Sequence, residues 1–383
     1  MPPWFEDAVS AAARINLKSP KALAEIAPVV EHLAKRFMRQ EDSLPKNYFS
    51  DAETRRAYIS YFFATNVMKI HPVLNELERA EFFVNRDRVR VLDIGTGVGT
   101  ASIGLWMWMA RQRSPAALHI VATDESPEVC EEAARTVQTF RKHIDTPSLE
   151  FEKQPVPLDS LAAAGLGTFD VIMAQNVLIE SPEYQALIEF AQGALRDDGA
   201  LILIEPASRF GSRALLQCRD ALVSAGLTIY APCLMQGACP ALVKDSDWCH
   251  TVARWDRPKF VKIIDEQIGN LRLSLKFSYV IAMKKKLNIA ATFPHVRADA
   301  LYRVGSDRID EKGRKKLYGC GTAGRFFFEK QKRDTTDANA AFDESHRYDI
   351  LEIEGFVPKA TFQRLNPDGT VNMVERFEKK TEL

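Results

Sequence analysis

The stretch "RVRVLDIGTGVGT", residues 88–100, constrains the fold of this chain more than any other. An apolar run ends at Asp93, and Gly95, Gly97 and Gly99 follow at every second position before a helical segment begins. Glycines at this spacing allow a tight turn and let the backbone approach a ligand without a Cβ in the way. The helix beyond the turn would offer free N–H groups to a carboxylate or phosphate. The stretch therefore predicts a strand, a ligand-binding turn and a helix.

The residues around this turn alternate between strand-like and helix-like segments. Apolar runs such as "LHIVATD", "FDVIMAQNVL" and "GALILIEPA" are separated by segments with helical periodicity. Such alternation predicts an α/β fold with a parallel, doubly wound sheet and helices on both faces. We expect this domain to span residues 81–230, after an N-terminal helical region over residues 1–80.

The rest of the chain is less regular. Residues 231–330 are expected to form a cysteine-rich, basic, β-rich lobe, and residues 331–383 a polar linker followed by a C-terminal hairpin. Asp368-Gly369 is the expected turn of that hairpin, since Asp-Gly is a preferred two-residue hairpin loop.

Asp124, at the end of the second predicted strand, lies 29 residues after Gly95 and could accept both ribose hydroxyls of a nucleotide. A nicotinamide-binding Rossmann domain has a similar acidic residue. However, "LDIGTGVG" and "FDVIMAQNVL" resemble motifs of the class I S-adenosylmethionine-dependent methyltransferases, a likeness that spans residues 88–228. The resemblance implies that the three glycines line the methionine part of S-adenosylmethionine, that Asp93 reaches its amino group through water, and that Asp124 holds its ribose.

Asn176 follows the fourth predicted strand and is also expected at the cofactor site. Methyltransferases that modify amino groups of bases commonly carry an Asn/Asp-Pro-Pro-aromatic motif here, and only the asparagine of that motif remains. Asn176 could orient a base, and a structural role at the strand end explains it equally well. No residue is assigned as a catalyst, so the sequence leaves open whether the protein transfers a methyl group.

Four cysteines form a second constellation. Cys233, Cys239 and Cys249 lie within seventeen residues, and Cys320 follows in a glycine-flanked turn. In a reducing compartment, clustered thiols are more often metal ligands than disulfides. Four thiolates from loops suit a [4Fe–4S] cluster or a tetrahedral zinc ion, with His250 as a possible substitute ligand, and unligated cysteines are the alternative.

The remaining two cysteines differ from this set. Cys130 and Cys218 lie on the apolar sides of predicted helices, which predicts that they fill the core.

The cysteine stretch "APCLMQGACPALVKDSDWCH", followed by "LKFSYVIAMKK" and a late "CG", resembles a family associated with the small ribosomal subunit. This family includes mitochondrial methyltransferase-like protein 17 and its bacterial relatives, and the likeness covers roughly residues 50–330. It implies a methyltransferase fold joined to an iron–sulfur cluster held by Cys233, Cys239, Cys249 and Cys320, and a role in assembling the small subunit. The preference for iron over zinc rests on this resemblance alone.

The distribution of charge points to a polyanionic partner. The chain is neutral overall, with 51 basic and 51 acidic residues, but residues 254–330 hold eighteen Lys or Arg against eight Asp or Glu. Combined with the family resemblance, which implies a role at the small subunit, this surplus makes small-subunit rRNA, with ribosomal proteins, the expected partner, although a solvated charged face would explain the surplus as well. No apolar run approaches the ~20 residues of a membrane helix, and we expect no membrane association.

Three functions fit these features. The first is a small-subunit assembly factor that binds rRNA and S-adenosylmethionine, the second an active rRNA methyltransferase, and the third a small-molecule methyltransferase with a structural zinc. The first residues lack the apolar core of a signal peptide, which favours the cytoplasm of a prokaryote, or the mitochondrion for a eukaryotic protein. The sequence does not determine the oligomeric state.

Overall fold

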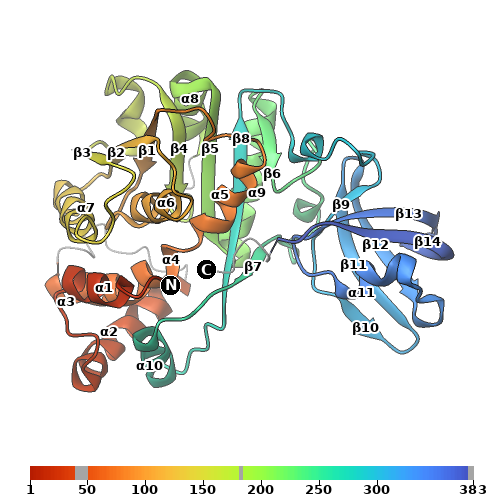
Figure 1. Ribbon diagram of the computed structural model, residues 1–383, viewed down its shortest axis with the longest axis horizontal. Helices are drawn as coiled ribbons and strands as arrows, with labels where there is room; N and C mark the ends of the chain where they lie inside the picture. The colour runs from red at the N-terminus through yellow and green to blue at the C-terminus, as the bar shows by residue number, and fades with distance from the viewer. Residues whose placement is uncertain (39–50, 181–183, 378–383) are drawn as a thin grey trace.

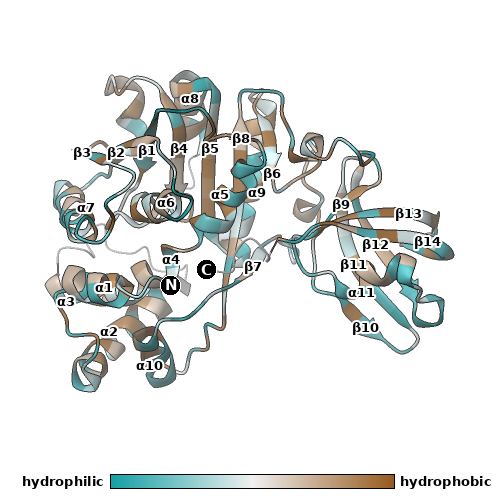
Figure 2. Cartoon of the chain, viewed as in Figure 1, coloured by the Kyte–Doolittle hydropathy of each residue, from teal (hydrophilic) through white to brown (hydrophobic). Residues whose placement is uncertain are grey.

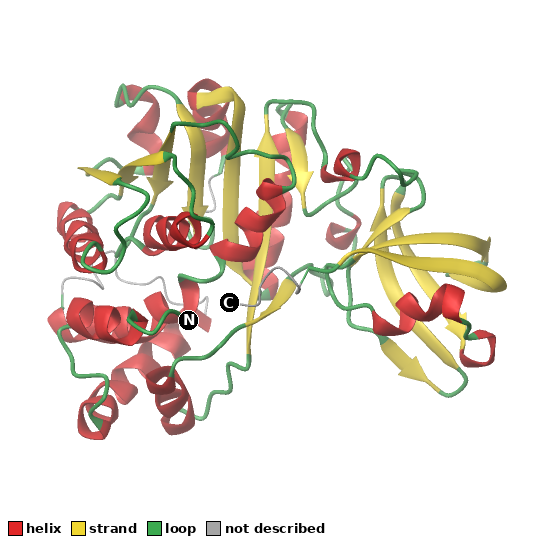
Figure 3. Ribbon diagram, in the orientation of Figure 1, coloured by secondary structure: helices red, strands yellow, loops and turns green. Residues whose placement is uncertain are grey.

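The computed structural model describes residues 1–38, 51–180 and 184–377. Figure 1 shows a central α/β domain, a layer of N-terminal helices beneath it, and a separate lobe of strands beside it. Figure 3 shows that the lobe consists mainly of strands, whereas the N-terminal layer is helical.

The central domain is built on an eight-stranded sheet with the order β3-β2-β1-β4-β5-β8-β6, in which β7 also pairs with β8. Strands β1 to β5 are parallel, and β8 runs antiparallel to both β5 and β6. The strands are β1 (Arg88–Ile94), β2 (Ala117–Thr123), β3 (Leu149–Gln154), β4 (Phe169–Gln175), β5 (Leu195–Pro206), β6 (Thr228–Ala231), β7 (Thr251–Arg254) and β8 (Ser274–Met283). The Rossmann-like α/β fold agrees with the expectation from the sequence.

Helices cover both faces of this sheet, which explains why its central strands are apolar throughout (Figure 2). Trp106 and Phe140 pack with α6 (Thr100–Arg111) and α7 (Pro127–Phe140) on one face. Ile188 and Leu215 belong to the core on the other face, from α8 (Gln185–Ala194) and α9 (Arg209–Ser224). Because parallel strands end on one edge of the sheet, the turns after β1, β2 and β4 lie together.

The N-terminal layer contains α1 (Phe5–Ala13), α2 (Pro20–Met38), α3 (Ala52–Ala57), a π-helix η1 (Tyr58–Phe63) and α4 (Ala64–Asn66). The next helix, α5 (Ile70–Glu78), leaves this layer and packs beside α6 on the face of the central sheet (Figure 1). Helix α10 (Lys259–Gln267) joins this layer from much later in the chain. Its buried Asp265 accepts hydrogen bonds from Tyr61 and, at 2.7 Å, from Arg257. A segment expected to lie in the basic lobe is therefore part of the N-terminal layer.

The separate lobe contains β9 (Leu301–Val304), β10 (Ile309–Glu311), β11 (Arg314–Gly321), β12 (Gly324–Gln331), α11 (Ala340–Glu344), β13 (Ile350–Pro358) and β14 (Gln363–Glu375). Its sheet has the order β10-β11-β12-β14-β13-β9, and β11 also pairs with β9. This last pairing closes five strands into a barrel. Its interior is filled by Tyr302, Leu317, Phe328, Leu351 and Leu365, among others.

The domain boundaries differ from those expected. Residues 231–330 do not form one lobe, since β8 is paired inside the central sheet and only residues from Leu301 onward enter the barrel. The segment after 330 is not a linker plus an independent hairpin, because β13 and β14 complete the barrel. The hairpin turn lies at residues 359–362, and Gly369 faces Gly355 inside the strand pair, where a Cβ on Gly355 would lie 2.8 Å from the Cα of Gly369.

Candidate functional site

The glycine turn joins β1 to α6 and adopts backbone angles that suit glycine. Gly95, Gly97 and Gly99 have φ values of 62°, 53° and 83°, all in the left-handed region. A Cβ on Gly95 would lie 2.7 Å from Cγ2 of Val177, whereas a Cβ on Gly97 would meet no atom within 4 Å. Gly95 therefore permits close packing of the turn against the segment after β4, and Gly97 leaves open space beside it.

Asp93 holds the turn to the first turn of α6. Its Oδ2 accepts hydrogen bonds from the Ser102 hydroxyl at 2.5 Å, the Ser102 N–H at 3.2 Å and the Thr96 hydroxyl at 2.9 Å. Burial raises the pKa of Asp93 to about 6, against these hydrogen bonds, which favour the ionised form. The carboxylate thus organises the loop directly, in addition to lining the pocket next to it.

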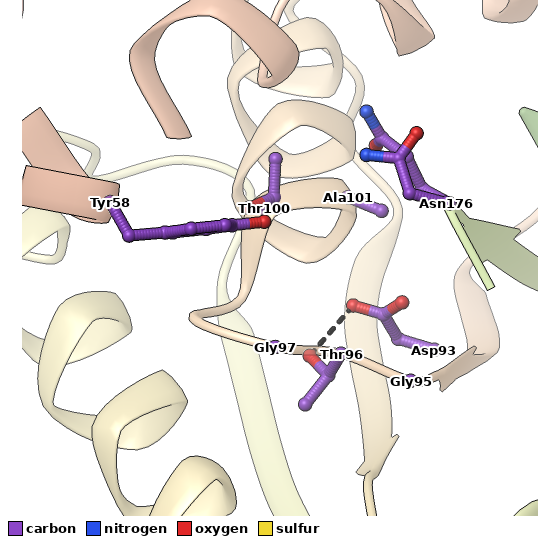
Figure 4. Close-up of a pocket in the computed structure, with 9 residues that line it drawn as sticks. Tyr58, Asp93, Gly95, Thr96, Gly97, Thr100, Ala101 and Asn176 are labelled. Carbon is purple, nitrogen blue, oxygen red and sulfur yellow. Dashed lines mark hydrogen bonds between the residues drawn. The ribbon is translucent and has the colours of Figure 1, made fainter. Parts of the chain in front are cut away.

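A small cavity lies above this turn. The lining residues come from η1, the glycine turn, the start of α6 and the end of β4: Tyr58, Asp93, Gly95, Thr96, Gly97, Thr100, Ala101, Gln175 and Asn176. Figure 4 shows Tyr58 and Asn176 on opposite sides of this space, with Thr100 between them. Thr100 and Ala101 are the first residues of α6, where backbone N–H groups have no intrahelical acceptor.

Asn176 has an unusual conformation for a residue with a side chain. Its φ is 62°, its N–H donates to the carbonyl of Ile204 at 2.8 Å, and its buried Oδ1 has no hydrogen-bond partner. The buried Oε1 of the adjacent Gln175 also has none. Two unpartnered polar atoms beside one cavity are the arrangement that a ligand with hydrogen-bond donors would satisfy.

Asp124 and Gly99 lie beside the cavity rather than in its lining. Asp124 accepts a hydrogen bond from the Gly97 N–H at 3.1 Å and from the Ser126 N–H at 3.3 Å, and burial raises its pKa. Gly99 caps α6 and packs against Val137. The structure therefore brings Asp93, Gly95, Gly97 and Asn176 together, with Asp124 bound to the same turn.

Sequence reasoning missed Tyr58, Thr96, Thr100 and Gln175. Thr96 and Thr100 lie inside the glycine motif itself, and Gln175 precedes Asn176, so a closer reading of those motifs could have found them. No local signal indicated Tyr58, because it reaches the pocket through the packing of the N-terminal layer on the sheet.

Two further ionisable groups, Glu205 and Lys69, lie near the ends of β4 and β5. Burial raises the pKa of Glu205 to about 8. Glu205 Oε1 accepts a hydrogen bond from the Leu178 N–H at 2.8 Å, and its Oε2 has no partner. Burial lowers the pKa of Lys69 to about 7, with Arg272 acting in the same direction and Glu205 against it. The region beside the cavity therefore holds groups that exchange protons near neutrality.

The four cysteines singled out by spacing act on one another electrostatically. Burial raises the pKa of Cys239 to about 12, and the thiols of Cys233 and Cys249 add to the rise. Burial also raises the pKa of Cys320 well above its usual range, and the other three thiols contribute. Residues distant in sequence thus converge between the central domain and the barrel. Cys130 and Cys218 are fully buried in the core, as predicted.

Arginines surround these thiols. Arg219 is wholly buried, donates to the carbonyls of Met235 and Gly237, and lowers the pKa of Cys239, while Arg325 acts likewise on Cys320. The Cys249 sulfur lies 3.3 Å from the Tyr348 hydroxyl. Across residues 1–38, 51–180 and 184–377, no three His, Cys, Asp or Glu side chains stand in a geometry that could hold a metal ion. The donor chemistry suits a soft metal, whereas the side-chain arrangement is not that of a formed metal centre.

A protein-family model described as "mitochondrial small ribosomal subunit Rsm22" matches residues 52–315, more than half of the chain. The chain belongs to this family. The match covers the glycine turn, the three cysteines Cys233, Cys239 and Cys249, and the first barrel strand, β9. The Rsm22-family match ends near the start of the barrel, so most of β11 and all of β12 to β14 lie outside it.

Solved structures similar to this chain include several methyltransferases. The C-methyltransferase domain of the citrinin polyketide synthase is 18% identical, with a TM-score of 0.39, and the likeness covers 64% of this chain and 60% of that one. Magnesium protoporphyrin IX methyltransferase from Synechocystis PCC 6803 is 16% identical, with a TM-score of 0.32, over 66% of this chain and 90% of the other. Fibrillarin from Aeropyrum pernix is 13% identical, with a TM-score of 0.33, over 57% and 76%. No curated protein matches the chain.

The sheet itself identifies the fold class. An order of 3-2-1-4-5 followed by an antiparallel strand inserted before β6 is the arrangement of class I methyltransferases. This Rsm22-family chain is therefore a methyltransferase-like protein. Among the described residues, no helix has both the length and the apolar character required to span a membrane.

Proposed function

We propose that this protein binds S-adenosylmethionine and acts in the assembly of the small ribosomal subunit, with rRNA and ribosomal proteins as its partners. The observation that carries the proposal is the Rsm22-family match over residues 52–315, whose description names the small ribosomal subunit. The protein would act wherever that ribosome is built, in a prokaryotic cytoplasm or in a mitochondrion.

The cofactor would occupy the cavity over the glycine turn. Its carboxylate would accept hydrogen bonds from the backbone N–H groups at the start of α6, where the helix dipole favours an anion. Asp124 would hold the ribose, Asp93 would keep the turn in shape and reach the amino group through water, and the three glycines would line the methionine part. Tyr58 would cover the ligand from the N-terminal layer. Bound there, S-adenosylmethionine supplies a methyl group that is activated by its sulfonium.

A second candidate function, methylation of rRNA, is favoured by the unpartnered polar atoms beside the cavity. The Oδ1 of Asn176 and the Oε1 of Gln175 are buried without hydrogen-bond partners. Either oxygen could accept a hydrogen bond from the amino group of a base and orient it toward the methyl group. The neighbouring Glu205 and Lys69 could hold or receive a proton, since both have pKa values shifted toward neutrality by burial.

The four converging cysteines would hold a [4Fe–4S] cluster, with zinc as the alternative. The proposal is supported by their mutual effect on thiol pKa and by the neighbouring Arg219 and Arg325, whose positive charges would offset the excess negative charge of four thiolates. The thiolates would have to turn toward a common centre on binding. A metal there would join the central domain to the barrel, so binding and folding of this region would be coupled.

The cofactor part of the proposal is tested by calorimetry with S-adenosylmethionine. Asp124→Ala should weaken binding by about 1–3 kcal/mol, because the variant loses hydrogen bonds to the ribose and to the turn. Sedimentation with purified small subunits tests the partner. Transfer of labelled methyl groups to rRNA would select the second candidate, and no transfer by a chain with bound cofactor would remove it.

The metal is tested by analysis of anaerobically purified protein. The Cys239→Ser variant should lose metal and the brown absorbance that a cluster gives at about 400 nm. Cys130→Ser is the matched control, because it removes a buried thiol away from the cluster and should leave the metal content unchanged. Equal metal contents in the two variants would remove the assignment.

A further inference from the structure

The strand pairing of the C-terminal barrel is that of a known class of nucleic-acid-binding folds. In chain order its five barrel strands are β9, β11, β12, β13 and β14, and they pair in a ring as first–second–third–fifth–fourth–first. All pairs are antiparallel except β12 with β14, and α11 lies between the third and fourth strands (Figure 1). This is the topology of the OB barrel, which binds oligonucleotides on its second and third strands and adjacent loops.

The side chains of those two strands alternate between the barrel interior and its outer face. Leu317 and Phe328 are paired in register and belong to the barrel core. Gly319 also faces inward, because a Cβ there would lie 2.9 Å from the Phe328 ring. The intervening register pairs therefore lie on the outer side of the strands, and they are Lys316 with Glu329, Tyr318 with Phe327, and Cys320 with Arg325. Glu329 is itself wholly buried, where it pairs with Arg314 and Arg364.

The outward pairs form a row of aromatic rings flanked by cations. The ring centroids of Tyr318 and Phe327 are 4.5 Å apart, and both side chains are partly exposed. The Lys316 ammonium lies 5.6 Å from the Phe327 ring, and the Arg325 guanidinium 4.9 Å from the Tyr318 ring. We call these four residues, Lys316, Tyr318, Arg325 and Phe327, the platform. Aromatic rings and guanidinium planes are the surfaces on which unpaired bases stack.

The charge of the barrel favours this face over the others for a polyanion. Residues 312–333, which hold β11 and β12, contain eight Lys or Arg and one Asp or Glu. Residues 350–375, which hold β13 and β14, contain two Lys or Arg and four Asp or Glu. Carboxylates from outside the hairpin neutralise part of this surplus, such as Glu311 at 2.9 Å from Lys316 and Asp247 at 2.5 Å from Arg325. Both pairs are partly buried, since only 14% of the Lys316 side chain and 21% of the Arg325 side chain are exposed. A phosphate would therefore have to displace these carboxylates to reach the two cations.

We propose that the platform binds a single-stranded segment of RNA, whose bases stack on Tyr318 and Phe327 while phosphates contact Lys316 and Arg325. A duplex hides the faces of its bases, so a stacking surface selects unpaired nucleotides. Cys320 lies on the same face in register with Arg325, which places the thiol cluster at one end of the RNA path. This inference rests on the proposed function, since it names the part of the subunit that the barrel would contact.

The test measures binding of a labelled oligouridine of about ten nucleotides, a length within the range that one OB barrel covers, to the full chain by fluorescence anisotropy. Tyr318→Ala and Phe327→Ala should each weaken binding about fivefold to a hundredfold. The matched control is the double variant Tyr318→Phe with Phe327→Tyr, which keeps both rings and should bind like the wild type. Lys316→Ala should lower the log–log salt slope by about 0.7.

Sedimentation with small subunits, run on the same variants, separates this inference from the proposed function. If the wild type binds neither subunits nor oligomer, both fail. If it binds subunits and the alanine variants bind the oligomer as tightly as the wild type does, only the platform is wrong. If the alanine variants no longer bind small subunits, and the wild type does not bind the oligouridine, the platform contacts a protein and the RNA assignment is overturned. Melting temperatures of the alanine variants that match the wild type guard against misfolding as the cause of lost binding.

Discussion

The glycine turn allows a paired test of loop geometry and ligand contact, because Gly95 and Gly97 share a backbone conformation but differ in their surroundings. Both have φ in the left-handed region, where alanine costs roughly 1–2 kcal/mol. A methyl group on Gly95 would also lie 2.7 Å from the stiff, β-branched Val177, which adds an overpacking cost of about 1–3 kcal/mol. Gly95→Ala should therefore lower the free energy of unfolding by about 2–5 kcal/mol, and Gly97→Ala by only about 1–2 kcal/mol.

For the affinity of the cofactor the order should reverse, so that Gly97→Ala has the larger effect and Gly95→Ala the smaller one. Gly97 lines the cavity with open space beside its Cα, so a methyl group would project toward the ligand. We expect Gly97→Ala to weaken S-adenosylmethionine binding about tenfold or more, equivalent to about 1.4 kcal/mol. Urea unfolding measures the stabilities and calorimetry the affinities.

The companion variant Gly95→Ala with Val177→Ala separates the two costs in Gly95→Ala. It removes the contacted methyl groups and should recover the overpacking cost but not the backbone strain. Equal stability of Gly95→Ala and Gly97→Ala would refute the packing argument. An unchanged affinity of Gly97→Ala would refute the placement of the cofactor over this turn.

Two further predictions concern buried charges. Since the pKa of Glu205 is raised from its ordinary 4.5 to about 8, the native state holds this proton more tightly than the unfolded chain, and stability should fall as pH rises between these values, by up to about 1.4 kcal/mol per pH unit. Glu205→Gln should lack this slope in urea unfolding, and parallel pH profiles of the two proteins would contradict the burial argument. Arg303 of β9 binds both carboxylate oxygens of Glu76 in α5, at 2.8 and 3.3 Å, and donates to the Pro232 carbonyl at 3.0 Å. Glu76→Gln should lower stability by about 3–5 kcal/mol by leaving a buried guanidinium unpaired, and adding Arg303→Met should restore part of it; a loss under 1 kcal/mol would show that the pair does not join barrel to domain.

The accuracy of the sequence predictions followed the range of the interactions involved. The strand, turn and helix around Asp93 could be predicted because each is determined by residues within one or two turns of chain. The hairpin turn at Asp368-Gly369 was wrong, because Gly369 is required by its close approach to Gly355 across the strand pair rather than by a turn. A glycine needed for packing and a glycine needed for a turn look alike in one sequence.

The local sequence alone determined the parallel strands and their glycine turn. It also separated the four clustered cysteines from Cys130 and Cys218, which fill the core. Only the tertiary structure decided which distant residues meet. Tyr58 reaches the cavity because the N-terminal layer packs beneath the sheet, and Cys320 joins the other thiols because β11 closes a barrel with β9. The physical reason is that helices, strands and turns depend mainly on residues close in sequence. A site is assembled by the burial of apolar surface, which depends on how the whole chain packs.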